Sequence, residues 1–150
     1  MKIFCFIITF LVLTNQLFAQ DKYSNLRNSQ YHFLIDADNN EILLGKNIDE
    51  RIAPSSMTKL MTAYVVFDQI KKGNINLKNR CVIGKDAWRK SGSSMFLNYG
   101  DVVTIEDLVK GLLATSANDA AIALAETTGT NFSHFIQLMN LKAKELNMRN

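Results

Sequence analysis

The stretch Pro54-Ser-Ser-Met-Thr-Lys59 decides how this chain of 150 residues is interpreted. It places Ser56 and Lys59 three residues apart at the start of a helical pattern, so their side chains share one helix face, roughly 5–6 Å apart at Cβ. A serine hydroxyl becomes a nucleophile when a nearby base accepts its proton, and a lysine amine serves as that base where its neutral form is favoured. The spacing alone is common, and a serine near a helix start is usually a cap. The surrounding sequence therefore has to decide between the two interpretations.

Outward from this stretch, turn and cap residues divide the chain into a hairpin followed by helices. Apolar runs predict strands at 31–36 and 41–46, joined by a tight turn at 38–40, where Asp and Asn tolerate left-handed backbone. Helical periodicity predicts helices from 56 to about 72, from 104 onward, from about 118 to 128 and from 131 to 146. Gly73 supplies a stop for the first helix, and Thr104 with Asp107 three residues later is similar to a capping box.

Apolar residues recur at helical spacing in three of these helices. We expect the stripes of the later helices to face the core. The recurring residues are Leu60, Met61, Ala63, Tyr64 and Phe67 in the first helix, Ile105, Leu108, Leu112 and Leu113 in the second, and Phe132, Phe135, Ile136, Met139 and Ala143 in the last.

The N-terminus predicts export. Met1-Lys2 is a minimal positive segment, and the apolar run that follows it has the length of a signal-peptide core and is too short to span a bilayer. We predict cleavage after Ala19, which divides the chain into a signal peptide at 1–19 and a domain at 20–150. Leu17 is larger than the residue usual at its position before a cleavage site, so an uncleaved membrane anchor is the alternative.

Composition argues against several classes of protein. The formal net charge of +3 is scattered rather than clustered, so nucleic acid is not an expected partner. Removal of the signal peptide takes Cys5 with it and leaves Cys81 as a lone cysteine, which argues against a disulfide scaffold. The two histidines, His32 and His134, have no accompanying Cys/His spacing, so we expect neither a metal site nor a cofactor.

Longer segments resemble the penicillin-binding D-alanyl-D-alanine carboxypeptidases, serine peptidases of the β-lactamase and DD-peptidase superfamily. The serine–lysine motif of these enzymes is accompanied by an S-x-N motif and a K-T-G motif. The resemblance runs in order, at family-like spacing, over about residues 30–150. It is carried by Arg51-Ile-Ala-Pro-Ser-Ser-Met-Thr-Lys-Leu-Met-Thr-Ala-Tyr64, Ile83-Gly-Lys-Asp-Ala-Trp88, Gly92-Ser-Ser-Met-Phe-Leu97, Gly111-Leu-Leu-Ala-Thr-Ser-Ala-Asn-Asp-Ala-Ala121 and Phe135-Ile-Gln-Leu-Met-Asn140.

The resemblance implies an α+β fold, in which an antiparallel sheet packs against a helical region. It implies that Ser56 is the acylated serine and that Lys59 takes its proton. Ser116 matches the serine that relays a proton to the leaving group, and Asn118 matches the asparagine that holds the substrate amide and helps orient Lys59. Without the resemblance, Ser116-Ala-Asn118 would be interpreted as a turn between helices.

The same resemblance implies partners and a location. Peptidoglycan stem peptides are the expected substrates, and β-lactam antibiotics are expected to act as covalent inhibitors. The expected location is the periplasm, at the outer face of the cytoplasmic membrane. Peripheral attachment to that membrane through a C-terminal segment missing from these residues is a further expectation.

Polar residues outside these motifs have plainer interpretations. Ser93 and Ser94 either line the cleft or form a loop turn. Glu126 lies on the third predicted helix and is not expected to act as a general base. Trp88 is expected to pack rather than to stack on substrate.

The family's Lys-Thr-Gly triad has no counterpart in the 150 residues. In the family this triad lies on a later strand, binds the terminal carboxylate of the substrate, and is accompanied by the second oxyanion N–H. We therefore expect an incomplete fold that lacks its C-terminal strands and leaves a sheet edge and a helix face uncovered. Losing one oxyanion donor costs on the order of 10²–10³ in rate, so we expect this chain alone to be weakly active or inactive.

Two alternatives to the carboxypeptidase interpretation stay open. The first is a non-catalytic remnant, which is either unfolded alone or serves only as the binding partner of a complementary fragment. The second is a hydrolase similar to the class A β-lactamases, which share the fold. Such an enzyme would need a deacylating glutamate in a loop that would lie beyond Asn150.

Overall fold

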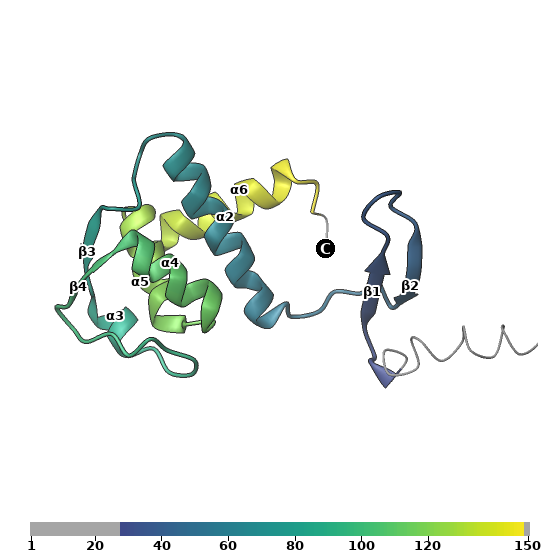
Figure 1. The fold of residues 1–150 in the computed structure, drawn as a ribbon, viewed down its shortest axis with the longest axis horizontal. Coiled ribbons are helices and arrows are strands. Elements are labelled where there is room, and N and C mark those ends of the chain that lie inside the picture. The colour runs from purple at the N-terminus through teal and green to yellow at the C-terminus, as the bar shows by residue number, and fades with distance from the viewer. Residues whose placement is uncertain (1–27, 149–150) are drawn as a thin grey trace, which may run out of the picture. The chain divides into compact units, whose positions relative to one another are not determined.

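The structure, a computed structural model, describes residues 28–148 of the chain (Figure 1). Its described residues form two compact units, one of residues 28–51 and one of residues 52–148. Each unit is described by itself below. The predicted signal peptide at 1–19 lies outside the described residues.

The first unit is a β-hairpin, as the sequence predicts. Strand β1 (His32–Ile35) pairs with strand β2 (Ile42–Lys46) in an antiparallel ladder that carries an irregularity at its turn end. The turn is closed by local hydrogen bonds: the backbone N–H of Asp38 donates to the Asp36 carboxylate over 2.8 Å. Asn40 takes a positive φ of 59°, the left-handed conformation that asparagine tolerates best among non-glycine residues.

The second unit is mostly helical, and its four long helices confirm the four that were predicted. Three short elements, β3, α3 and β4, were not predicted; β3 and β4 pair antiparallel with each other. The elements in order are the 3₁₀ turn η2 (Ser55–Met57), α2 (Thr58–Lys71), β3 (Arg80–Val82), α3 (Lys85–Trp88), β4 (Val102–Thr104), α4 (Ile105–Ala114), α5 (Asn118–Thr128) and α6 (Phe132–Glu145).

The predicted helix ends are formed by backbone and side-chain caps. At the end of α2, Gly73 takes a φ of 77°, its N–H bonds the Ile70 carbonyl, and the N–H of Asn74 bonds the Gln69 carbonyl. This pair of bonds is the Schellman arrangement, which satisfies carbonyls that a helix end would otherwise leave free. At the start of α4, Thr104 Oγ1 accepts from the N–H of Asp107 over 3.1 Å, as the capping box predicts.

Helix α5 lies at the centre of the second unit, where it contacts α2, α3, α4 and α6 (Figure 1). Its small residues allow this close packing, because three of its five buried residues are Ala. The large side chains that are fully buried around it come from α2, α4, α6 and the segment after β3. They are Val65, Val66, Ile83, Ile105, Leu108, Leu112 and Phe135.

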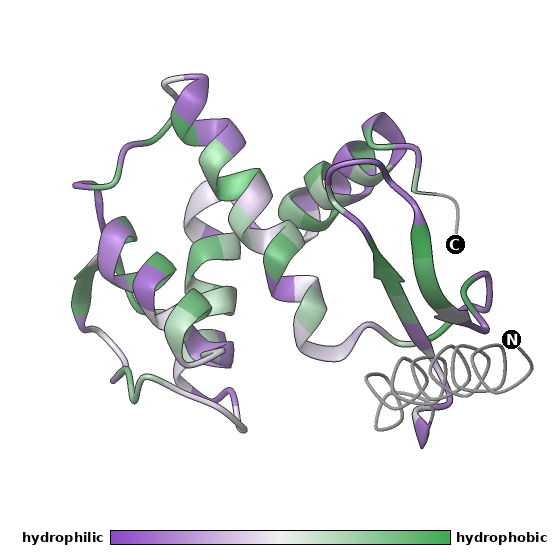
Figure 2. Ribbon diagram, turned by 45° about the vertical axis from the view of Figure 1, so that its right-hand side comes forward, coloured by the Kyte–Doolittle hydropathy of each residue, from purple (hydrophilic) through white to green (hydrophobic). Residues whose placement is uncertain are grey.

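Of the five residues that recur at helical spacing in α2, only Ala63 belongs to its buried face. The residues it buries are Thr62, Ala63, Val65, Val66 and Gln69. Leu60, with 66% of its surface exposed, and Tyr64 and Phe67, each with 46%, lie on the other side. Figure 2 shows this helix hydrophobic over much of its length, so apolar pattern alone could not decide which face is covered.

Smaller corrections apply to α4 and α6. Leu113 was expected in the core but is half exposed, whereas Val109 is buried in its place. In α6, Phe135 is buried as expected, while Phe132 and Ile136 keep 45% and 38% of their surface exposed. The last two side chains line a pocket that contains two of the predicted site residues.

No helix within residues 28–148 is long and apolar enough to cross a membrane.

Candidate active site

Ser56 lies in the 3₁₀ turn η2, two residues before Thr58, the first residue of α2. Its side chain is exposed. The turn is fixed by Ser55, which takes a φ of 48°, and by a bond from the N–H of Met57 to the Pro54 carbonyl of 3.0 Å. This position leaves Ser56 at the N-terminal end of a helix of 14 residues, where free N–H groups and the helix dipole favour negative charge.

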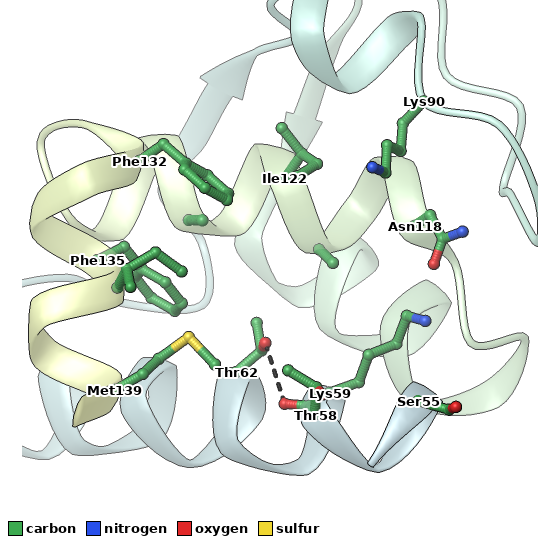
Figure 3. A pocket seen from close by; sticks show the side chains of 13 residues that line it. Ser55, Thr58, Lys59, Thr62, Lys90, Asn118, Ile122, Phe132, Phe135 and Met139 are labelled. Carbon is green, nitrogen blue, oxygen red and sulfur yellow. Dashed lines mark hydrogen bonds between the residues drawn. The ribbon is translucent and has the colours of Figure 1, made fainter. Parts of the chain in front are cut away.

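Lys59 and Asn118 line one pocket, although 59 positions separate them in the chain. The pocket has a volume of about 250 Å³ and lies among α2, α5 and α6. Figure 3 shows the side-chain nitrogen of Lys59 and the amide oxygen of Asn118 turned toward each other at one end of it. Lys90 also lines the pocket beside Asn118, so this end carries two lysine side chains, and the opposite end is apolar.

Two of the four predicted site residues do not line this pocket. Ser56 and Ser116 are absent from its lining, and Ser55, the neighbour of Ser56, lines it instead. Within residues 28–148, no side-chain hydrogen bond joins Ser56 to Lys59. The structure therefore brings Lys59 and Asn118 together, with Ser56 one turn of chain away at the start of the same helix.

Ser116 and Asn118 are held in the tight connection between α4 and α5. Ser116 takes a φ of 56°, and the N–H of the next residue, Ala117, bonds back to the Gly111 carbonyl over 3.3 Å. Ala117 is fully buried.

Asp119 is the site-region residue that sequence reasoning missed. It keeps 2% of its surface exposed, and its carboxylate accepts hydrogen bonds from Ser94 Oγ over 2.6 Å and from the N–H groups of Met95, Leu97 and Ala120 over 3.1, 3.2 and 2.9 Å. The available signal was its position directly after the Ser116-Ala-Asn118 triplet. Because Ser94 is bound to Asp119, the loop-turn interpretation of Ser94 is the correct one.

The hydrogen bonds of Asp119 also decide its charge. Burial acts to raise the pKa of Asp119, but the bonds from Ser94, Leu97, Met95 and Ala120 together hold that pKa below its ordinary value. The carboxylate is therefore ionised at neutral pH. Its four donors make it a charge-assisted anchor between α5 and the loop before β4.

No group of three or more His, Cys, Asp or Glu side chains within residues 28–148 is placed to hold a metal ion. The single cysteine in that range, Cys81, is a buried thiol whose pKa is raised by its burial. A buried thiol with a raised pKa is a poor nucleophile, so Cys81 is part of the core and not of the site.

Solved structures with the same fold are penicillin-binding proteins and related peptidases. The D-alanyl-D-alanine carboxypeptidase DacD from Francisella tularensis matches 82% of this chain with a TM-score of 0.77 and 38% sequence identity, over 30% of its own chain. Penicillin binding protein 5 from Haemophilus influenzae matches 81% of this chain with a TM-score of 0.77 and 36% identity, over 36% of its own chain. The fold is therefore the α+β fold of the DD-peptidases.

The chain belongs to the D-alanyl-D-alanine carboxypeptidase family, whose pattern matches residues 19–150. The D-alanyl-D-alanine carboxypeptidase DacC of Escherichia coli is 42% identical over 123 residues, which are 78% of this chain and 31% of that protein. The chain spans about a third of the length of the curated relatives it matches. The resemblance found in the sequence motifs is thus confirmed at the level of family and fold.

Proposed function

We propose that this chain carries the nucleophile and proton-transfer groups of a serine-type D-Ala-D-Ala carboxypeptidase that acts on peptidoglycan stem peptides. The observation that carries the proposal is the meeting of Lys59 and Asn118 at one pocket beside the helix start that bears Ser56, in a chain of this family. β-Lactams are proposed as covalent inhibitors, in keeping with the penicillin-binding proteins that share the fold.

In the proposed reaction, the Lys59 amine accepts the proton of Ser56 Oγ as that oxygen attacks the carbonyl carbon between the two D-alanines. The N-terminal end of α2 stabilises the oxyanion that forms. The carbon–nitrogen bond then breaks as Ser116 gives its hydroxyl proton to the departing D-alanine nitrogen and takes up the proton held by Lys59, so Lys59 is neutral again and an ester on Ser56 remains. Asn118 holds the amide of the substrate backbone. Water hydrolyses the ester, which releases the shortened peptide and restores Ser56.

Labelling with a reporter-tagged penicillin tests the nucleophile. We expect intact-mass analysis and peptide mapping to place one label on Ser56 after prolonged incubation, and we expect Ser56→Ala to abolish the label. Ser55→Ala is the matched control, because its serine is adjacent in the chain and the label should still map to Ser56. A label that maps to Ser55, or one that persists in Ser56→Ala, contradicts the assignment.

The rate of that labelling tests the expectation of weak activity. The 150 residues contain no Lys-Thr-Gly, so the carboxylate anchor and the second oxyanion donor of the family are absent from them. We expect acylation about 10²–10³-fold slower than in a D-alanyl-D-alanine carboxypeptidase that has the triad. Rapid, stoichiometric acylation of Ser56 in the purified 150-residue chain would overturn this expectation.

We also propose that the protein is exported, with residues 1–19 as its signal peptide. Support comes from the positive start and the apolar run of signal-peptide length. N-terminal sequencing of the product from a bacterial envelope fraction should find Gln20 as the first residue. A product that begins at Met1 and stays with the membrane would instead favour the uncleaved anchor. Peripheral membrane attachment through a further segment is proposed from the family resemblance alone.

A further inference from the structure

A second cavity of the helical unit adjoins the first pocket and carries charges of both signs. It has a volume of about 290 Å³. Two carboxylic acids, two basic residues and two apolar residues line it: Asp86, Glu126, Arg89, Lys90, Ile122 and Phe132. Three of these side chains also line the first pocket and are visible in Figure 3: Lys90, Ile122 and Phe132. The two cavities therefore share a wall, and Lys90 lies at their junction.

The cavity is formed where α3 meets α5. Asp86 lies in α3, and the two basic residues follow that helix directly. Glu126 lies on α5, and its carboxylate is close to the start of α3, because a Cβ built on Gly84 would be 2.9 Å from Glu126 Oε2. Burial raises the pKa of Glu126, and the nearby charge of Asp86 raises that pKa further. The two carboxylates therefore form one acidic side of the cavity.

The four charged side chains of this cavity do not neutralise one another. Within residues 28–148, none of them forms an ion pair or a side-chain hydrogen bond. By contrast, the salt bridges of the same unit join Lys72, Lys110 and Lys142 to carboxylates over 2.6–3.0 Å. A partly buried carboxylate without a donor is costly, and a bound cation would offset that cost. Unpaired charges of both signs at one cavity thus indicate a ligand that carries both signs.

We propose that this cavity binds the zwitterionic head group of an amino acid, with the ammonium at the two carboxylates and the carboxylate at the two basic side chains. An ammonium offers three donors, and the guanidinium of Arg89 can hold a carboxylate through two parallel hydrogen bonds. The two apolar lining residues form a wall for an aliphatic side chain. A free amino acid carries this head group, and so does a diamino acid within a peptide, at the end of its side chain.

A titration followed by nuclear magnetic resonance tests the proposal on the purified chain. The probe is norleucine, which carries the zwitterion on a straight aliphatic chain. N-acetylnorleucine lacks the ammonium, and norleucinamide lacks the carboxylate. We expect norleucine to shift the signals of Ile122, Glu126 and Phe132, and each analogue to bind roughly 10–100-fold more weakly, because each loses charge-assisted hydrogen bonds.

Charge variants assign the two halves of the site. Glu126→Gln should weaken norleucine binding roughly 10-fold or more but should not weaken the binding of N-acetylnorleucine, which has no ammonium. Arg89→Gln should weaken norleucine binding to a similar degree but should not weaken that of norleucinamide. Lys85→Gln is the matched control, because Lys85 lies in the same helix, 5.8 Å from the centre of the Tyr99 ring, and does not line the cavity. It should change the affinity less than about twofold.

Gly84→Ala tests the geometry without changing a charge. Gly84 has a φ of −77°, which alanine adopts freely, but the added Cβ would displace the Glu126 carboxylate. We expect this variant to fold and to weaken norleucine binding. A short peptide that contains diaminopimelate distinguishes the two sources of the head group. Tighter binding of the peptide than of norleucine assigns the site to a peptide, and the reverse order assigns it to a free amino acid.

Three outcomes would overturn the proposal. Norleucine at millimolar concentrations could leave the signals of the cavity residues unshifted. Both analogues could bind as tightly as norleucine does. The Glu126→Gln, Arg89→Gln and Lys85→Gln variants could weaken binding equally, which would mark a general effect of charge. None of these measurements requires acylation of Ser56, so their outcome is independent of the proposed function.

Discussion

At the scale of single residues, two carboxylates on α5 show opposite responses to burial. Asp119 receives four hydrogen bonds, and its pKa is held low in spite of its burial. Glu126, two turns farther along the helix, has a raised pKa, first because burial disfavours its charged form and second because Asp86 is nearby. It lies at a second cavity, of about 290 Å³, together with Asp86, Arg89 and Lys90. The two carboxylates differ in the hydrogen bonds that stabilise their charged forms: Asp119 receives four and, within residues 28–148, Glu126 receives none.

Glu126→Gln should therefore stabilise the protein at neutral pH. A carboxyl whose pKa is higher in the folded than in the unfolded state loses stability as pH rises through the folded value, and the loss is absent below the unfolded value, about 4.3. We expect the midpoint of thermal unfolding to rise by roughly 1–3 °C at pH 7 and not at all near pH 4. Thermal scans of both proteins across this range measure the difference.

Asp119→Asn is the control, because its effect on the unfolding temperature at pH 7 should have the opposite sign. The folded-state pKa of Asp119 is lowered, so its contribution is present above the unfolded value, about 3.9, and is lost as pH falls through the folded value. The variant should unfold at a lower temperature than wild type at pH 7, and the gap should narrow in acid. An equal effect of Glu126→Gln at pH 4 and pH 7 would contradict the account of Glu126.

At the scale of helices and strands, local signals predicted where elements begin and end. Gly73 and Thr104 could be interpreted from sequence because their bonds join residues three to five positions apart. Strands β3 and β4 could not, because each has three residues, too few to show a period. Their pairing brings Arg80 opposite Thr104, a contact between distant parts of the chain.

Local sequence signals also could not predict which helix faces are buried or which residues meet at the site. Helix α2 is apolar on both sides, so its neighbours decide that Thr62 and Gln69 are buried while Leu60 is exposed. The family resemblance predicted that Lys59 and Asn118 would lie together. The spacing of the two residues in the sequence did not predict it. Asp119 escaped notice because its partners lie 22 to 25 positions earlier in the chain.

At the scale of the helical unit of residues 52–148, a broad apolar surface along α2 and α6 is left uncovered by the other described residues of that unit. We call it the α2–α6 groove. It has a volume of about 530 Å³ and its lining is almost entirely apolar: Pro54, Met57, Thr58, Leu60, Met61, Tyr64, Met139, Asn140, Ala143, Leu146 and Met148. A salt bridge of 3.0 Å between Lys142 and Asp68 joins the two helices beside it. The sequence predicts an uncovered helix face, and the described residues of this unit contain one.

Exposed apolar surfaces of this kind bind hydrophobic dyes and drive self-association, which gives the groove a measurable consequence. Leu60→Gln should lower both the fluorescence of a bound hydrophobic dye and the fraction of oligomer in sedimentation, because Leu60 is 66% exposed within the groove. Its free energy of unfolding should change by less than ~0.5 kcal/mol, as for other surface substitutions. Val65→Ala, on the buried face of the same helix, should leave the dye fluorescence and the oligomer fraction unchanged. It should lower the free energy of unfolding by about 2 kcal/mol, because two methyl groups are deleted and a cavity remains. If Leu60→Gln destabilises the protein as much as Val65→Ala does, then Leu60 is covered in solution and the groove is closed by part of the protein itself.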